Sequence, residues 1–181
     1  IDEVFAIMAL ASAHTFQVLT KRADRMREYF ENHFTRHKIA AHASKYSGKK
    51  DGALETCDHD ICNMKFPLDN VWLGVSVEDQ RRANERIRHL LNTPAAIRFL
   101  SMEPLVGGVD LNALTSPAIK DDADAVPLVN ETCLYHAGDR PAILPMHDTN
   151  KIDWVIVGGE SGHSARPMHP DWAHYLKDQC V

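Results

Sequence analysis

The sequence predicts an α/β protein built on a parallel sheet. Three apolar runs of strand length occur at residues 71–77, 97–102 and 152–157. Each run is apolar throughout rather than at alternate positions, as in strands that are buried on both faces. Segments with helical spacing follow the strands. Strands that alternate with helices predict a parallel sheet covered on both sides by helices, which is either a (β/α) barrel, or part of one, or an open doubly wound sheet.

The N-terminal third predicts a helix, a strand and a second helix. Residues 2–11 carry one apolar stripe for packing, formed by Val4, Ile7, Met8 and Ala11. Residues 15–20 are rich in β-branched and aromatic side chains, which is typical of a short buried strand. The helix that follows has one apolar side made by Ala23, Met26 and Phe30. Residues 33–69 lose this periodicity, and we expect an insertion or a long loop there.

Regular structure returns with the strand at 71–77. The next helix has apolar positions at i, i+4, i+7 and i+8, which are Ala83, Ile87, Leu90 and Leu91, and Pro94 closes it. The strand at 97–102 ends at Glu103-Pro104. Residues 112–150 are rich in proline and acidic side chains and predict a second insertion. After the strand at 152–157, Pro170 opens a last helix. We therefore expect one domain over residues 1–181 with two long irregular insertions.

Composition excludes several classes of protein. The chain has 181 residues, 44% of them apolar and 25% charged, which is typical of one globular domain. No stretch reaches the roughly 18 to 20 apolar residues that cross a bilayer, and Asp2 and Glu3 argue against a signal peptide. The net charge of −5 does not favour a generally basic, nucleic-acid-binding protein. We expect no membrane partner and a cytoplasmic location.

The cysteines predict neither a disulfide scaffold nor a metal site. The four cysteines are scattered through the chain, at Cys57, Cys62, Cys133 and Cys180. Cys57 and Cys62 frame a loop with Asp58, His59 and Asp60, but four residues separate them and no second ligand pair accompanies them. We assign no metal ligand to this chain.

Polar and charged side chains follow the predicted strands. Lys21 follows the first strand, Glu78 the second and Glu103 the third. Because parallel strands end at one edge of a sheet, these groups are expected at one rim, where a carboxylate can accept a hydrogen bond from a ligand or act as a general acid or base. Glu78 also fits a simple first-turn acid at the start of the following helix. Pro104 restricts the backbone of Glu103 and so directs its side chain.

The last strand runs into a glycine-rich turn, residues 158–162. Gly158 and Gly159 permit positive φ and a close approach of a ligand to the backbone, while Ser161 can donate to an anion. A tight strand-to-helix turn explains the same residues. Arg166 can pair with Glu160 or bind a ligand carboxylate or phosphate. The turn fits neither the dinucleotide-binding and phosphate-loop patterns nor a serine-hydrolase nucleophile elbow.

Four ordered blocks of this sequence resemble a known family. They are residues 14–22, 70–80, 98–105 and 153–162 with 165–168, and they include Thr20-Lys21-Arg22, Ser101-Met102-Glu103-Pro104 and Gly158-Gly159-Glu160-Ser161-Gly162. These blocks closely resemble the phage-related, DUF5131-type family of uncharacterised function that carries an N-terminal three-cysteine motif. The resemblance implies a partial TIM-like (β/α) barrel, similar to radical-SAM enzymes, in a chain that is a fragment of a longer barrel.

The resemblance also implies cofactors that this chain does not hold by itself. A full-length protein would use S-adenosylmethionine and an iron–sulfur cluster, whose cysteines are expected upstream of residue 1. Gly158-Gly159-Glu160 is similar to the Gly-Gly-Glu that contacts the methionine amino group in radical-SAM enzymes. We assign catalytic roles to Lys21, Glu103 and Glu160, and ligand binding to Glu78, Gly158, Gly159, Ser161 and Arg166. The substrate is unknown.

A non-catalytic binding module in phage biology is the alternative. Residues 1–50 carry nine Lys and Arg against five acids, which favours nucleic acid weakly. If the barrel lacks strands, exposed sheet edges favour self-association or poor solubility. We also expect no iron–sulfur chromophore after anaerobic reconstitution of residues 1–181, because thiolate ligands at suitable spacing are absent.

Overall fold

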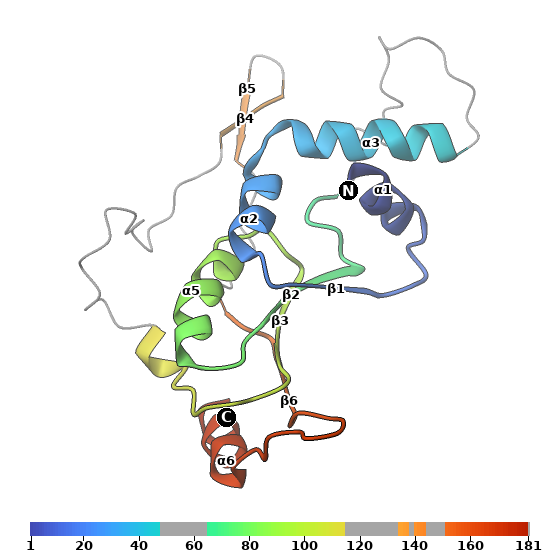
Figure 1. Cartoon of the computed structure of the whole chain (residues 1–181). Coiled ribbons are helices and arrows are strands. Elements are labelled where there is room, and N and C mark those ends of the chain that lie inside the picture. The colour runs from blue at the N-terminus through green and yellow to red at the C-terminus, as the bar shows by residue number, and fades with distance from the viewer. Residues whose placement is uncertain (48–64, 115–133, 138–139, 144–150, 181) are drawn as a thin grey trace.

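The computed structural model describes residues 1–47, 65–114, 134–137, 140–143 and 151–180 (Figure 1). Within these parts the strands are β1 (Phe16–Thr20), β2 (Val71–Ser76), β3 (Ile97–Met102), β4 (Leu134–Ala137), β5 (Arg140–Ile143) and β6 (Trp154–Val157). The helices are α1 (Asp2–Leu10), α2 (Ala23–Glu31), α3 (Phe34–Tyr46), α5 (Gln80–Leu91), α6 (Pro170–Gln179) and the short 3₁₀ helix η1 (Asn112–Leu114).

The predicted parallel sheet is confirmed. It has four strands in the order β1-β2-β3-β6, and every neighbouring pair is parallel. Among the described strands β1 and β6 are the outer ones, so the sheet is not closed. This arrangement is common to a barrel segment and to an open sheet. The strands β4 and β5, which lie inside the predicted insertion 112–150, form a separate antiparallel pair.

The main core lies on one face of the sheet. Register pairs Leu73 with Val18, Val75 with Leu100, and Met102 with Val157, and all of these side chains belong to one hydrophobic cluster. The five α-helices of the described chain contribute to the same cluster, through Phe5, Met26, Ile39, Ile87 and Leu176. The predicted helix layer on both sides of the sheet is therefore wrong for the described residues.

The opposite face of the sheet carries aromatic side chains, of which Phe99 is buried, Trp72 is partly buried and Trp154 is exposed. The ring of Phe99 lies over Gly74, where a β-carbon would come within 2.6 Å of the ring, and Phe99 is only 2% exposed. Trp72 and Trp154 meet edge to face at a ring distance of 5.8 Å. Strand runs that are apolar on both faces thus arise here without a second layer of described helices, since aromatic side chains lie on the second face and Trp154 stays exposed there. We call the surface made by Trp72, Gly74, Phe99 and Trp154 the aromatic face.

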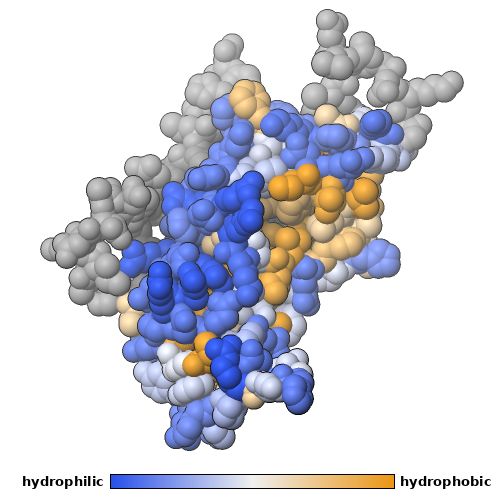
Figure 2. Space-filling model, in the orientation of Figure 1, coloured by the Kyte–Doolittle hydropathy of each residue, from blue (hydrophilic) through white to orange (hydrophobic). Residues whose placement is uncertain are grey.

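Helix α1 forms as predicted, but only part of its predicted packing stripe faces the core. Met8 packs against the core, whereas Val4 and Ile7 are half exposed and the buried residues are Phe5 and Ala6. Phe5 is drawn inward because its ring packs against those of Tyr29 and Phe30 on α2. Figure 2 shows the resulting apolar patch over α1.

Residues 34–46 form helix α3, not the loop predicted for 33–69. Thr35, Ile39 and Ala43 recur every four residues and are buried, and α3 packs beside α1 at one end of the molecule (Figure 1). Most residues of this buried stripe are small or polar, so the helical period is hard to see in the hydropathy of the sequence. Residues 48–64, with Cys57 and Cys62, lie outside the described part of the chain.

The remaining helices follow the predictions closely. Helix α5 buries Ala83, Ile87 and Leu90 as the spacing requires, and α6 begins with Pro170 at its first turn. Loop residues Leu105 and Val109 continue the core between the sheet and α6. In the described residues, every helix falls short of the length and apolar character that spanning a membrane requires.

Candidate functional site

The carboxyl ends of β1, β2, β3 and β6 meet at one edge of the sheet. The loop after β3 ties these ends together, because Leu105 N–H donates to the Gly158 carbonyl at 2.9 Å and Val106 N–H donates to the Glu78 carbonyl at 2.9 Å. Gly158 directly follows β6, and Glu78 lies two residues after the end of β2. The positions of Glu78, Glu103 and Gly158 are therefore fixed by main-chain hydrogen bonds, which is what a preorganised ligand site requires.

Lys21 and Glu78 form an ion pair at this edge. Lys21 Nζ lies 2.7 Å from Glu78 Oε1, and Arg86 Nη1 lies 3.0 Å from Glu78 Oε2. Burial raises the pKa of Glu78, but the hydrogen bond from Lys21 and the charges of Arg86 and Lys21 outweigh it, so the pKa lies below its ordinary value. Glu78 is thus an ionised acceptor held between two cations. It is not the helix cap, since Asp79 caps α5 by accepting a hydrogen bond from Arg82 N–H at 2.8 Å.

Glu103 lies over the backbone of Gly158. Its carboxylate and Cγ occupy the space that a β-carbon at residue 158 would need. Gly158 is required here for this close approach and not for a positive φ, which the described glycines show at Gly162 alone (φ 104°). The Glu103 side chain is exposed, and no described residue donates a hydrogen bond to its carboxylate or pairs with it.

Glu160 and Arg166 close a short exposed loop. Arg166 donates three hydrogen bonds to the Glu160 carboxylate, from N, Nε and Nη2, at 2.9, 2.8 and 3.1 Å. These bonds lower the pKa of Glu160 to about 2, the side-chain bond contributing most. Ser161 lies exposed at the start of the loop, and the loop turns through positive φ at Gly162 and Ser164.

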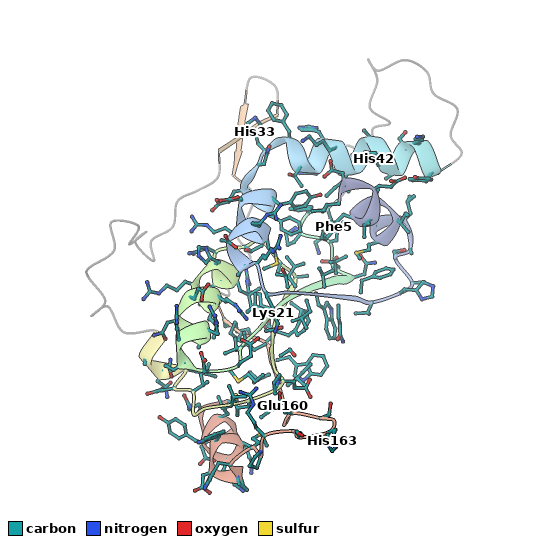
Figure 3. All side chains as sticks on the ribbon, viewed as in Figure 1. Phe5, Lys21, His33, His42, Glu160 and His163 are labelled. Atoms are coloured by element: carbon teal, nitrogen blue, oxygen red, sulfur yellow. The ribbon has the colours of Figure 1, made fainter. Side chains whose placement is uncertain are left out.

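The structure separates the predicted site residues into three groups. Lys21 follows β1 and Glu160 follows β6, the two outer strands, so three strand spacings, or about 14 Å in all, lie between these strand ends. In Figure 3 Glu160 lies with His163 near α6, away from Lys21. Glu103, directly after β3, lies between Lys21 and Glu160 along the edge of the sheet. Lys21 contacts Glu78, Glu103 contacts Gly158, and Glu160 contacts Arg166, and none of the three predicted catalytic side chains contacts another.

Three residues of this edge were missing from the predicted site. Arg86 is 7% exposed and reaches the end of β2, and Ser76 and Ser101 are a buried register pair two residues before Glu78 and Glu103. A signal for Arg86 was present, because it lies within the buried stripe of α5, between Ala83 and Ile87. A charged residue at such a position needs a buried partner.

The described residues do not form a metal site. No three His, Cys, Asp or Glu side chains gather in a metal-binding arrangement in the ranges that the structure describes. Cys180 is exposed and follows α6, and Cys57, Cys62 and Cys133 lie outside the described residues. Iron–sulfur clusters need several thiolates, so the described donor set does not fit one.

Comparison with known families identifies the family of this chain. The family described as "Protein of unknown function (DUF5131)" matches residues 1–181. The chain belongs to this family. DUF5131 membership confirms the coarse form of the resemblance, a family of uncharacterised function, while a phage association and a radical-SAM-like activity go beyond the family description. No curated protein and no solved structure matches this chain.

Proposed function

We propose that this DUF5131 chain is part of a radical-SAM-like (β/α) barrel, and that its strand-end edge binds S-adenosylmethionine. The observation that carries the proposal is the Glu103 carboxylate, which lies over Gly158 without a partner among the described residues. Ligands of parallel α/β proteins bind at the carboxyl ends of the strands. A fixed, unpaired carboxylate at this edge suits a ligand ammonium group.

The proposed roles follow the three groups of contacts. Glu103 accepts hydrogen bonds from the ligand ammonium, and the missing β-carbon at Gly158 leaves room for the Glu103 carboxylate to lie at this place. Gly159 and Ser161 are proposed to contribute exposed polar groups beside the ligand. Glu160 is engaged by Arg166, so we propose that this pair shapes the loop and that Glu103 takes the ammonium-binding role which the resemblance suggested for Glu160.

The two implied cofactors fit the described residues differently. The exposed Glu103 carboxylate, which Gly158 allows to lie against its backbone, suits the amino-acid end of S-adenosylmethionine, whose sulfonium group supplies an activated carbon when it is bound. The described residues do not fit an iron–sulfur cluster, and we derive no step through one. Nucleic acid binding stays a prediction, since two of the basic residues that suggested it, Lys21 and Arg27, are paired with Glu78 and Glu31.

The test is the affinity of the chain for S-adenosylmethionine, measured by ligand-observed NMR. Glu103→Gln removes the charge but keeps the shape, and we expect affinity to fall about tenfold, as for the loss of one charge-assisted hydrogen bond. Glu85→Gln is the matched control, because Glu85 pairs with Arg82 on the exposed side of α5. Equal affinity in the wild type and Glu103→Gln would refute the proposed role of Glu103.

A further inference from the structure

Arg86 is a buried cation whose position is set by two acceptors at the end of β2. Its Nη1 donates to the Ser76 carbonyl at 2.7 Å and to Glu78 Oε2 at 3.0 Å. The side chain leaves α5 from its buried stripe and is 7% exposed. Its buried Nε has no partner among the described residues. The cost of burying this guanidinium is therefore offset mainly by the strand-end carbonyl and by Glu78.

Glu78 connects Arg86 to Lys21. The two carboxylate oxygens are divided, Oε2 facing Arg86 and Oε1 facing Lys21 Nζ at 2.7 Å. The Glu78 side chain is 16% exposed, whereas that of Lys21 is 63% exposed. An exposed lysine alone samples many rotamers. Because Arg86 fixes the Glu78 carboxylate, the Lys21 ammonium has one preferred position at the edge of the sheet.

The charge balance of the three groups leaves one positive charge facing outward. Two cations share one carboxylate, and the buried cation is the one bonded to the backbone. Lys21 is thus the accessible member of the group. We propose that Arg86 and Glu78 are positioning residues that hold the Lys21 ammonium at the strand-end edge as the binding group for a ligand carboxylate.

This inference rests on the proposed function and deepens it. Lys21 offers a positive charge on the β1–β2 side of the edge, and Glu103 offers a negative charge on the β3–β6 side. The Glu160–Arg166 pair is internally neutral. A ligand whose carboxylate faces Lys21 and whose ammonium faces Glu103 matches both charges. The ligand class is therefore an α-amino acid group rather than a simple anion or a simple amine.

A double-mutant cycle tests the positioning role. We expect Lys21→Met and Arg86→Met each to weaken binding of S-adenosylmethionine about tenfold, and the double variant to be no weaker than either single variant. Decarboxylated S-adenosylmethionine should bind wild type and Lys21→Met equally. Arg86→Lys should restore part of the affinity, because it returns the charge. Additive losses, or an unchanged affinity in Arg86→Met, would overturn the inference.

A second readout does not depend on the ligand. In ¹³C NMR spectra of the protein with ¹³C-methylated lysines, the Lys21 signal should show a restrained side chain. The Lys21 side chain should become mobile in Arg86→Met and in Glu78→Gln. Glu78→Gln keeps the hydrogen bond from Arg86 to the Ser76 carbonyl, so it tests the same role if Arg86→Met does not fold. Arg82→Met is the control, because Arg82 pairs with Glu85 away from the edge.

The two readouts separate the possible failures. Absence of S-adenosylmethionine binding by the wild type would refute the proposed function. In that case an increase in the mobility of the Lys21 side chain in Arg86→Met and Glu78→Gln still supports the positioning role. A Lys21 signal that is already mobile in the wild type, or is unchanged in both variants, would overturn that role whatever the ligand result.

Discussion

The missing β-carbon of Gly158 determines where the Glu103 carboxylate lies in the candidate site. The space beside the Gly158 backbone is filled by the Glu103 side chain, and a methyl group there would displace it. Since Glu103 is exposed, its side chain can swing away without disturbing the core. The identity of residue 158 therefore controls the position of the carboxylate more than the stability of the fold.

We expect Gly158→Ala to separate binding from stability. The free energy of unfolding should change by less than about 1 kcal/mol, because only a flexible side chain must move, while affinity for S-adenosylmethionine should fall about tenfold, as in Glu103→Gln. Urea denaturation and NMR titration measure the two quantities. Gly108→Ala is the control, since its nearest neighbour, Trp172 Cδ1, is at an ordinary contact distance of 3.6 Å. Full affinity in Gly158→Ala would argue that Glu103 does not contact the ligand.

The Glu160–Arg166 pair predicts how the loop at 160–166 responds to acid. The pKa of Glu160 is lowered from 4.5 to about 2 by its hydrogen bonds from Arg166. A depressed carboxyl pKa means that the pair is complete above pH 4.5 and is lost as the pH falls toward 2. The ¹³C carboxyl signal of Glu160 should titrate near the lower value, and in Arg166→Gln it should titrate close to 4.5. Similar titration curves in both proteins would contradict the paired loop.

At the scale of single elements, Asp79 explains where α5 begins. Its side chain accepts from Arg82 N–H, as expected for a residue just before a helix. Asp79→Ala should lower the free energy of unfolding by about 1 kcal/mol, the usual cost of losing an N-terminal cap. Asp69→Ala, which breaks an exposed pair with Lys65, should change it by less than about 0.5 kcal/mol. Equal effects in urea denaturation would mean that Asp79 is not an effective cap.

Sequence periodicity predicted those elements whose buried stripe is strongly apolar. Ala83, Ile87 and Leu90 located α5, and the apolar run at 97–102 matches β3. Helix α3 was missed because Thr35 and Ala43 carry little hydropathy signal. The inward face of α1 was missed because it depends on the rings of Tyr29 and Phe30, which come from another helix. Local pattern cannot contain such tertiary contacts.

The candidate site was predictable to the level of the sheet edge. Parallel strands were enough to bring Lys21, Glu78, Glu103 and Gly158 to one rim. Their pairing was not predictable, since it depends on side-chain directions and on Arg86 reaching the strand end from α5. The same limit applies to Glu160, which sequence patterns linked equally well to a ligand and to Arg166.

At the scale of the whole molecule, the two faces of the sheet differ in what covers them. The described helices pack on one face, and the aromatic face carries Phe99 over Gly74 with Trp72 and Trp154 beside them. Ser76 and Ser101, a register pair, lie between these rings and the carboxylates at the strand ends. A ligand at the edge would therefore meet the charged side chains first, and the apolar rings of the aromatic face would lie behind them.

The most direct measurement is chemical-shift mapping of S-adenosylmethionine on the ¹⁵N-labelled chain. We expect the largest shifts on the amides of Gly158, Gly159 and the loop after β3, and smaller ones at Lys21 and Glu78. These shifts should weaken together in Glu103→Gln. Shifts confined to α1 and α3, or an unchanged spectrum at saturating ligand, would contradict a ligand site at the carboxyl ends of the strands.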